Sequence, residues 1–326
     1  MSRGAKVWAT PWSPPAAWKT NKKTTNGGSL LPGDYQKYAD YLCSYVTTLK
    51  SQTGIDLYAL SIQNEPDYVA QWDSCIWTGA EFQNFIKNFL APTFGAAALT
   101  TEVIMPEASG WDFTLAAPTL NDPVAAAGVQ IIAAHGYSGS IAPCPLAQGH
   151  GKRLWETEVS DFAAFDPTIR SGLGYAKKIH DWIITGGVNA WHYWWLISGN
   201  PDNEGLLGSG GTNYQVTKRL YAIGNFSKFI RPGFVRIAAT PSAAAGVLVS
   251  AYKDPSKGNF AIVAINQGSS NIALNVAFHG FTTPSVTPWV TSASLDLVQQ
   301  PPLQAGTAFS PTLAAQSVTT FVGLGH

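Results

Sequence analysis

The chain has 326 residues, of which 45% are hydrophobic and only 12% are charged, so it can build a sizeable core but not a strong electrostatic field. Its 20 basic and 20 acidic residues give a formal net charge of +0, which argues against nucleic acid or another polyanion as a partner. No apolar run reaches the roughly 18 residues of a membrane span, and the odd number of cysteines (Cys43, Cys75 and Cys144) excludes a fully paired disulfide framework.

Strand-like and helix-like segments alternate up to about residue 230. This alternation predicts a parallel sheet with right-handed crossover connections. Strands are expected at residues 6–10, 57–63, 103–105, 129–134, 153–157 and 190–194. Amphipathic helices are expected at residues 34–50, 80–90, 172–185 and 217–229, where apolar side chains recur at helical spacing.

The pattern changes after residue 230. Short β-like segments follow, separated by Gly, Pro, Ser and Asn, and charged residues become scarce. We therefore expect a catalytic barrel over residues 1–230 and a β-sandwich side domain over residues 231–326. Residues 301–317 are low in complexity and are expected to form a loop within the sandwich.

Six strands are fewer than a closed barrel requires. The expected fold class is α/β: a (β/α)8 TIM-type barrel, N-terminally shortened, with a C-terminal antiparallel β domain. Six parallel strands with two open edges leave backbone groups unpaired. A second chain could cover these edges in a dimer, so the oligomeric state stays open at this point.

Two glutamates stand at the ends of predicted strands. Glu65 closes the run Leu60–Pro66, where Pro66 ends the strand, and Glu158 closes the run Leu154–Glu158. A glutamate before proline is more often only a strand terminus. Two carboxylates at different strand ends of one barrel, however, could flank a glycosidic bond. Glu156 shares a strand face with Glu158, but Glu158 lies nearer the rim, and Glu156 is interpreted as a supporting partner.

Aromatic residues are frequent around these motifs, with 12 Trp, 12 Tyr and 15 Phe in the chain. Such rings suit the C–H faces of sugars at a wet, concave surface. Trp12 follows the first strand in a turn fixed by prolines, and Tyr137 is expected to contact the nucleophilic carboxylate. Tyr193 and Trp194, from the run 191–195, are further candidate substrate contacts. The histidines show no paired ligand spacing, so no metal is expected.

Together these motifs resemble glycoside hydrolase family 30, and its bacterial xylanase branch in particular. Six motifs occur in the family's order: residues 9–21, 61–68, 135–137, 154–158, 191–195 and 228–237. The resemblance implies a retaining endo-β-1,4-xylanase that needs no cofactor and acts on a polysaccharide, xylan, outside the cell, although no signal-peptide pattern precedes residue 7. It aligns Glu65 with the acid/base and Glu158 with the nucleophile. It also aligns Trp12, Asn64, Tyr137 and Trp194 with the subsite at the scissile bond.

Two departures from the family keep alternatives open. The first two strand–helix units of the barrel have no counterpart here. In addition, the stretch 196–204 lacks the arginine with which glucuronoxylan-specific members pair the glucuronate side group. The alternatives are an endo-β-1,6-galactanase or glucanase of the same family, and an inactive carbohydrate-binding remnant.

Overall fold

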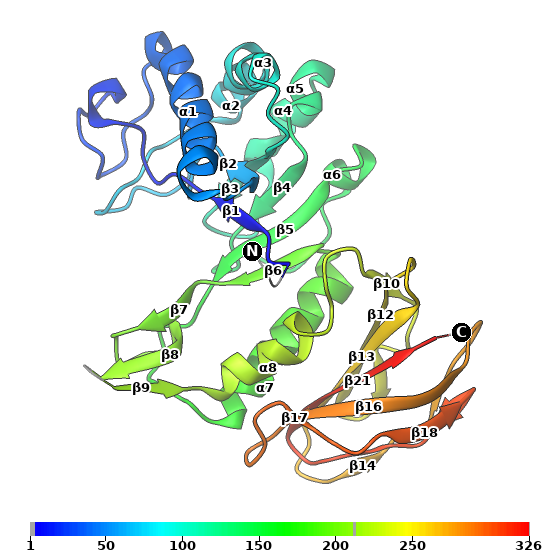
Figure 1. The fold of residues 1–326 in the computed structure, drawn as a ribbon. Helices are drawn as coiled ribbons and strands as arrows, with labels where there is room; N and C mark the ends of the chain where they lie inside the picture. The colour runs from blue at the N-terminus through cyan, green and yellow to red at the C-terminus, as the bar shows by residue number, and fades with distance from the viewer. Residues whose placement is uncertain (1–3, 211–212, 326) are drawn as a thin grey trace. The chain divides into compact units, whose positions relative to one another are not determined.

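The computed structural model describes residues 4–210 and 213–325, and the chain divides into two compact units (Figure 1). The first unit comprises residues 1–159 and 185–193. The second comprises residues 160–184 and 194–326. Each unit is described by itself.

A six-stranded parallel sheet forms the centre of the first unit, and its strands pair in chain order from β1 to β6. The six strands are β1 (Val7–Ala9), β2 (Leu57–Ser61), β3 (Glu102–Ala108), β4 (Ile131–Ala134), β5 (Arg153–Val159) and β6 (Ala190–Tyr193). Every predicted parallel strand is therefore present within the described residues. The predicted α/β class, with six strands of a TIM-type barrel, is confirmed.

Helices connect these strands, as parallel pairing requires. They are α1 (Tyr35–Thr53), α2 (Gly79–Phe85), α3 (Ala91–Ala96), α4 (Ala117–Leu120), α5 (Pro123–Ala127) and α6 (Pro145–Gly149); a π-helical turn, η3 (Ile86–Leu90), joins α2 to α3. Figure 1 shows α1 to α5 gathered on one side of the sheet. No helix of the described residues is both long and apolar enough to cross a bilayer.

Local sequence explains where the long helices begin and end. In α1, Tyr38, Leu42 and Val46 recur at four-residue spacing and form its buried stripe. The helix stops at Gly54, whose φ of 71° lies in the left-handed region that glycine adopts without steric cost. Thr78 caps α2, because its side chain accepts from the N–H of Glu81 while the Glu81 side chain accepts from the N–H of Thr78.

Side chains from the strands fill one face of the parallel sheet. Ala59, Ile104, Ile131, Ala133 and Trp155 form a buried cluster, against which Trp8, Tyr58 and Ala190 pack. The ring of Trp155 packs edge-on against that of Trp8 at 6.2 Å and stacks on that of Tyr58 at 6.0 Å, so large rings and small alanines fill the layer together. This packed layer fixes the strand ends, where the site described below is located.

The second unit contains the helices α7 (Ile169–Asp181) and α8 (Lys218–Ser227) and several sheets, whose described strands are antiparallel except for one parallel pair. The two helices contact each other, and β7 (Trp195–Ser198), β8 (Gly205–Gly210) and β9 (Asn213–Val216) form a small sheet in which β7 and β8 are the parallel pair. The remaining strands are β10 (Val235–Ile237), β11 (Ser242–Ala244), β12 (Val247–Lys253), β13 (Asn259–Asn266), β14 (Ile272–Ala273), β15 (Val276–Ala277), β16 (Thr283–Thr291), β17 (Val298–Gln299), β18 (Leu303–Gly306), β19 (Ala308–Phe309), β20 (Thr312–Leu313) and β21 (Ser317–Leu324). Their main sheet has the order β10-β12-β13-β21-β16-β17.

One detail of this unit differs from the sequence-based expectation. Residues 301–317 are not a continuous loop, because β18, β19 and β20 lie within them and pair with β16, β15 and β14. The nine-residue strand β16 contains Pro284 and Pro288, although proline cannot donate a ladder hydrogen bond. Pro288 nevertheless pairs with Phe321 of β21, and on its other side its carbonyl accepts from the N–H of Gln300.

A buried lysine holds together the two loops beside the end of β2. The side chain of Lys19 is fully buried, and its Nζ donates to Ser13 Oγ at 3.0 Å, to the carbonyl of Thr24 at 3.1 Å and to the carbonyl of Ser74. Backbone bonds run alongside, from the N–H of Ser74 to the carbonyl of Thr24 and from the N–H of Ile76 to the carbonyl of Gly28. Burial lowers the pKa of Lys19 because it disfavours the charged ammonium group, and the three acceptors stabilise that charged form.

We expect Lys19→Met to lower the free energy of unfolding by about 2–3 kcal/mol, because it removes a charged donor from three buried acceptors. The change should appear as a lower midpoint of urea unfolding followed by tryptophan fluorescence. The exposed Lys23→Met is the matched control. Equal midpoints for the two variants would contradict this account of Lys19.

Candidate active site

Glu65 lies just beyond the carboxyl end of β2 and is held there by its neighbours' backbones. The N–H of Asn64 donates to the carbonyl of Pro11 at 2.9 Å, and the N–H of Glu65 donates to the carbonyl of Glu107 at 3.0 Å. Glu65 has a φ of 44°, in the left-handed region that costs a residue with a side chain roughly 1–2 kcal/mol. The surrounding hydrogen bonds therefore hold Glu65 in an unfavourable backbone conformation, and in this conformation its side chain reaches His135.

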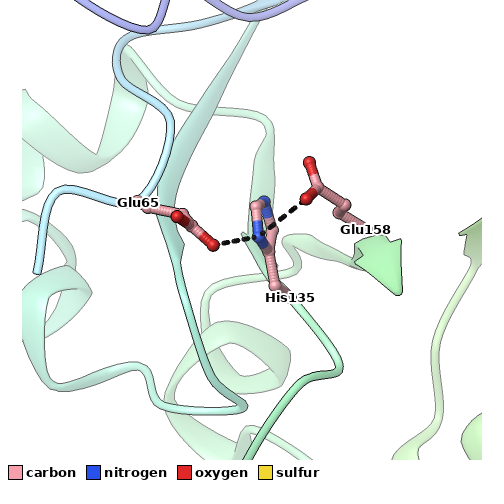
Figure 2. Close-up of side chains that lie close together, drawn as sticks. All are labelled: Glu65, His135 and Glu158. Atoms are coloured by element: carbon pink, nitrogen blue, oxygen red, sulfur yellow. Dashed lines mark hydrogen bonds and ion pairs between the residues drawn. The ribbon is translucent and has the colours of Figure 1, made fainter. Parts of the chain in front are cut away.

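His135, which follows β4, lies between two of the site's carboxyl groups (Figure 2). Its Nδ1 is 3.1 Å from Glu65 Oε1 and 3.8 Å from Glu158 Oε1. Its Nε2 is 3.6 Å from Oε1 of a third carboxylate, Glu107. The imidazole ring is fully buried. Its two nitrogens face carboxyl groups from the ends of three different strands, β2, β3 and β5.

Sequence reasoning missed Glu107. The residue belongs to β3 and is almost fully buried, with a φ of 61°, and it accepts a hydrogen bond from Thr10 Oγ1 at 2.7 Å. A signal was present, because Glu107 comes two residues after the predicted strand 103–105, just as Glu65 comes two residues after 57–63 and Glu158 one residue after 153–157. His135 was not among the site residues predicted from the sequence, whereas the structure places it at the centre of the carboxyl groups.

Glu158 is fixed from two sides at the end of β5. Tyr137 donates its hydroxyl to Glu158 Oε1 at 2.9 Å, as predicted for this tyrosine, and the N–H of Gly136 donates to the carbonyl of Glu158 at 2.8 Å. On its own strand, the N–H of Glu158 donates to Glu156 Oε1 at 3.1 Å. The carboxylate therefore has little freedom to turn away from His135.

Burial and charge set the protonation of this cluster. Burial alone would lower the pKa of His135, but the interactions with Glu107 and Glu65 and the charge of Glu158 outweigh it and raise that pKa to about 10. Burial raises the pKa of Glu158 to about 7, against the opposing effects of the His135 charge and the Tyr137 hydrogen bond. At neutral pH the ring is an imidazolium.

The spacing of the two outer carboxylates indicates what the cluster can do. The facing atoms of Glu65, His135 and Glu158 all lie within 4.8 Å of one another. Such atoms could share a metal ion, but a ring with a pKa of about 10 keeps its proton and donates through it. Two carboxyl groups at this separation instead suit attack and proton transfer on opposite sides of one bond, because a spacing of about 5–5.5 Å leaves no room for a water between carboxylate and reacting carbon.

The other candidate residues lie in different places. Asn64 is buried beside Glu65, and its Oδ1 has no hydrogen-bond donor among the described residues. The carbonyl of Trp12 accepts from Gln63 Nε2 at 2.8 Å, which ties the loop after β1 to the end of β2. Tyr193 ends β6, with its ring 6.4 Å from that of Trp191.

Trp194 belongs to the second unit, where its ring stacks on that of Trp195 at 5.5 Å. The structure therefore brings Asn64 and Tyr137 next to the two glutamates, while Trp194 is described only within its own unit.

Comparison with known proteins gives a consistent set of relatives. Residues 1–167 match the model of the glycosyl hydrolase family 30 TIM-barrel domain. The chain is 36% identical to the glucuronoxylanase XynC of Bacillus subtilis (strain 168), over 99% of this chain and 75% of that protein. It is similar in structure to a family 30 subfamily 8 xylanase, Xyn30A, from Clostridium acetobutylicum, with a TM-score of 0.89 and 38% identity over 99% of this chain and 81% of that one. A family 30 endoxylanase from Clostridium papyrosolvens C71 gives a TM-score of 0.83 and 36% identity, over 99% and 80% of the two chains.

Removal of one hydroxyl tests the electrostatics of the cluster. Tyr137→Phe deletes the hydrogen bond that favours the ionised form of Glu158, so we expect the titration midpoint of that carboxyl to rise by roughly one pH unit. The midpoint can be followed by NMR of protein labelled with ¹³C at the glutamate carboxyl carbons. Tyr45→Phe, on the exposed surface of α1, is the control. A midpoint unchanged by Tyr137→Phe would refute the assigned role of the hydroxyl.

Proposed function

This chain belongs to glycoside hydrolase family 30, and on that premise we propose that it is a retaining endo-β-1,4-xylanase with Glu65 as acid/base and Glu158 as nucleophile. It is a glycoside hydrolase, and the xylanases among its relatives match it over almost its whole length. The observation that carries the mechanism is the spacing of the facing atoms of Glu65 and Glu158, within 4.8 Å of each other. No cofactor takes part in this mechanism.

The proposed reaction has two steps. In the first, the Glu158 carboxylate attacks the anomeric carbon, the bond from that carbon to the leaving oxygen breaks, and Glu65 gives its proton to that oxygen. In the second, the Glu65 carboxylate takes a proton from water, whose oxygen attacks the same carbon and releases Glu158. The anomeric configuration is retained because the carbon is inverted twice.

The surroundings of the two glutamates support this division of roles. Tyr137 and the positive His135 both favour the ionised form of Glu158, which is the form that attacks. The unsatisfied Asn64 Oδ1 is an acceptor for the 2-hydroxyl of the sugar, a contact that strengthens in the transition state. We also assign substrate contacts to Trp12, Tyr193 and Trp194.

Exposed aromatic side chains follow the acid/base in sequence. Tyr68 and Trp72 are 47% and 50% exposed, and their ring centroids lie 6.2 Å apart. A neutral polysaccharide suits such a pair, because sugar C–H faces pack on aromatic rings. Since Glu65 protonates the leaving group, we place xylose units on the leaving-group side near these rings.

The remaining assignments complete the proposal. We assign catalysis to a barrel over residues 1–230 and treat residues 231–326 as a β-sandwich side domain. We also propose that the protein acts outside the cell, where its polymeric substrate is found.

The two roles can be tested by substituting each glutamate and by restoring the reaction of the variants with a small nucleophile. Glu65→Gln and Glu158→Gln should each lower kcat on xylan about a thousandfold or more, while the surface variant Asp56→Asn leaves it unchanged. With an aryl xylobioside and azide, Glu158→Ala should yield the α-glycosyl azide, because azide attacks once from the empty face. Glu65→Ala should yield the β-azide, because azide then attacks the glycosyl-enzyme. The opposite pair of products would reverse the assignment.

A substrate panel tests the choice of polymer. Because residues 196–204 contain no arginine to clamp a glucuronate, we expect reducing-sugar release from glucuronate-free arabinoxylan within about threefold of that from glucuronoxylan. Strict dependence on glucuronate would refute this. Release of sugar from β-1,6-galactan or β-1,6-glucan alone would favour an endo-β-1,6-galactanase or glucanase. Retention of xylan without release of sugar would favour an inactive carbohydrate-binding protein.

A further inference from the structure

The last stretch of β5 contains an irregularity directly beside the proposed nucleophile. Along the β5–β6 pair, Glu156 is opposite Trp191, but the next paired residues are Val159 and Tyr193. Two residues of β5 therefore face one residue of β6, which is the count of a β-bulge. A bulge removes ladder hydrogen bonds, so the N–H groups around it need other acceptors.

The side chain of Glu156 supplies both acceptors. Glu156 Oε1 accepts from the N–H of Glu158 at 3.1 Å, and Glu156 Oε2 accepts from the N–H of His192 at 3.1 Å. The residue is completely buried, so no solvent reaches this carboxyl group. Glu156 thus bridges the two strands across the bulge and binds the backbone of the residue that attacks the sugar.

The ring of His192 closes the bridge from the other strand. Its Nδ1 is 2.7 Å from the carbonyl of Glu156, which can only accept, so Nδ1 carries the proton. Burial lowers the pKa of His192, which keeps the ring neutral. The ring is packed against Trp8 and Trp155, with centroids 5.3 and 5.4 Å away. Glu156 is therefore held in one position.

We propose that Glu156 is a positioning residue for the nucleophile: its carboxylate replaces the strand partner lost at the β5 bulge and so fixes the backbone of Glu158. This inference rests on the proposed function of Glu158. The two carboxylate oxygens of Glu156 accept one N–H group each, from Glu158 and from His192, so one side chain serves both strands.

The charge of Glu156 depends on its neighbours. Burial raises its pKa to about 8, and the charge of Glu158 adds to this rise, while the N–H groups of His192 and Glu158 and the charge of His135 oppose it. The charge of Glu107 on β3 acts on the neighbouring His192 and opposes the lowering of its pKa by burial. Near neutral pH the carboxyl group can therefore change charge, and its ionised form is the one in which both oxygens accept strongly.

Glu156→Gln keeps the shape of the side chain but replaces one acceptor with an N–H₂ group, so one of the two backbone N–H groups loses its partner. We expect kcat on xylan to fall about ten- to a hundredfold with KM within about twofold, because the misplaced nucleophile affects the chemical step. Glu156 ionises near pH 8 and glutamine does not ionise, so the change in kcat that accompanies this ionisation in the wild type should also be absent from the variant's pH profile.

The control is Glu102→Gln, which removes a carboxylate from the amino end of β3, where it pairs with Arg153. A purely structural role for Glu156 would lower the urea midpoint without removing the change in kcat near pH 8. A pH profile of kcat that keeps this change, or a kcat within threefold of the wild-type value, overturns the inference. Wild type and Glu158→Gln are measured alongside. If the wild type releases no sugar, the result contradicts the proposed function and not the inference about Glu156.

A measurement on the wild-type protein decides the question even if Glu156→Gln does not fold. The chain has six histidines, and only His192 follows a tryptophan, so ¹³C-carbonyl tryptophan with ¹⁵N-histidine labelling identifies its amide by NMR. The amide proton of His192 should move downfield as pH rises through about 8, when Glu156 ionises. An amide that does not titrate there would overturn the inference, whatever the activity of the protein.

Discussion

The charge on His135 is the condition under which the rest of the site can be buried. Three carboxyl groups, those of Glu65, Glu107 and Glu158, lie around one imidazole ring that solvent does not reach. Carboxylates this close repel one another, and burial favours their neutral forms. An imidazolium with a pKa of about 10 compensates that repulsion and leaves one carboxylate free to ionise near neutrality. The proposed catalytic pair thus depends on a residue that performs no chemical step itself.

The backbone around the cluster is as important as the charges. Each acid follows or ends a different parallel strand, and hydrogen bonds between the loops hold it: Glu65 to Glu107, Asn64 to Pro11, and Gly136 to Glu158. The packed layer beneath these strand ends keeps them in register. The geometry of the site is therefore distributed over four neighbouring strands, so a small shift of one strand end would move a carboxylate relative to the ring.

The sequence predicted the parallel strands and the placement of Glu65 and Glu158 because both depend on simple rules: alternation of elements, and the meeting of parallel strand ends at one edge. It did not reveal Glu107 or the role of His135, because both depend on which side chains face each other once the sheet curls. The bulge in β5 was also invisible, because it is a property of the pairing between two strands and not of either one.

The left-handed backbone at Glu65 and Glu107 is an energetic cost that the fold alone does not require. Both positions carry an acid where glycine or asparagine would relieve strain, and both place that acid among like charges. Exchange of either glutamate for glycine would relieve the strain and the repulsion and would also remove a carboxylate from around His135. Stability and the chemistry of the cluster are thus in opposition at the same two backbone positions.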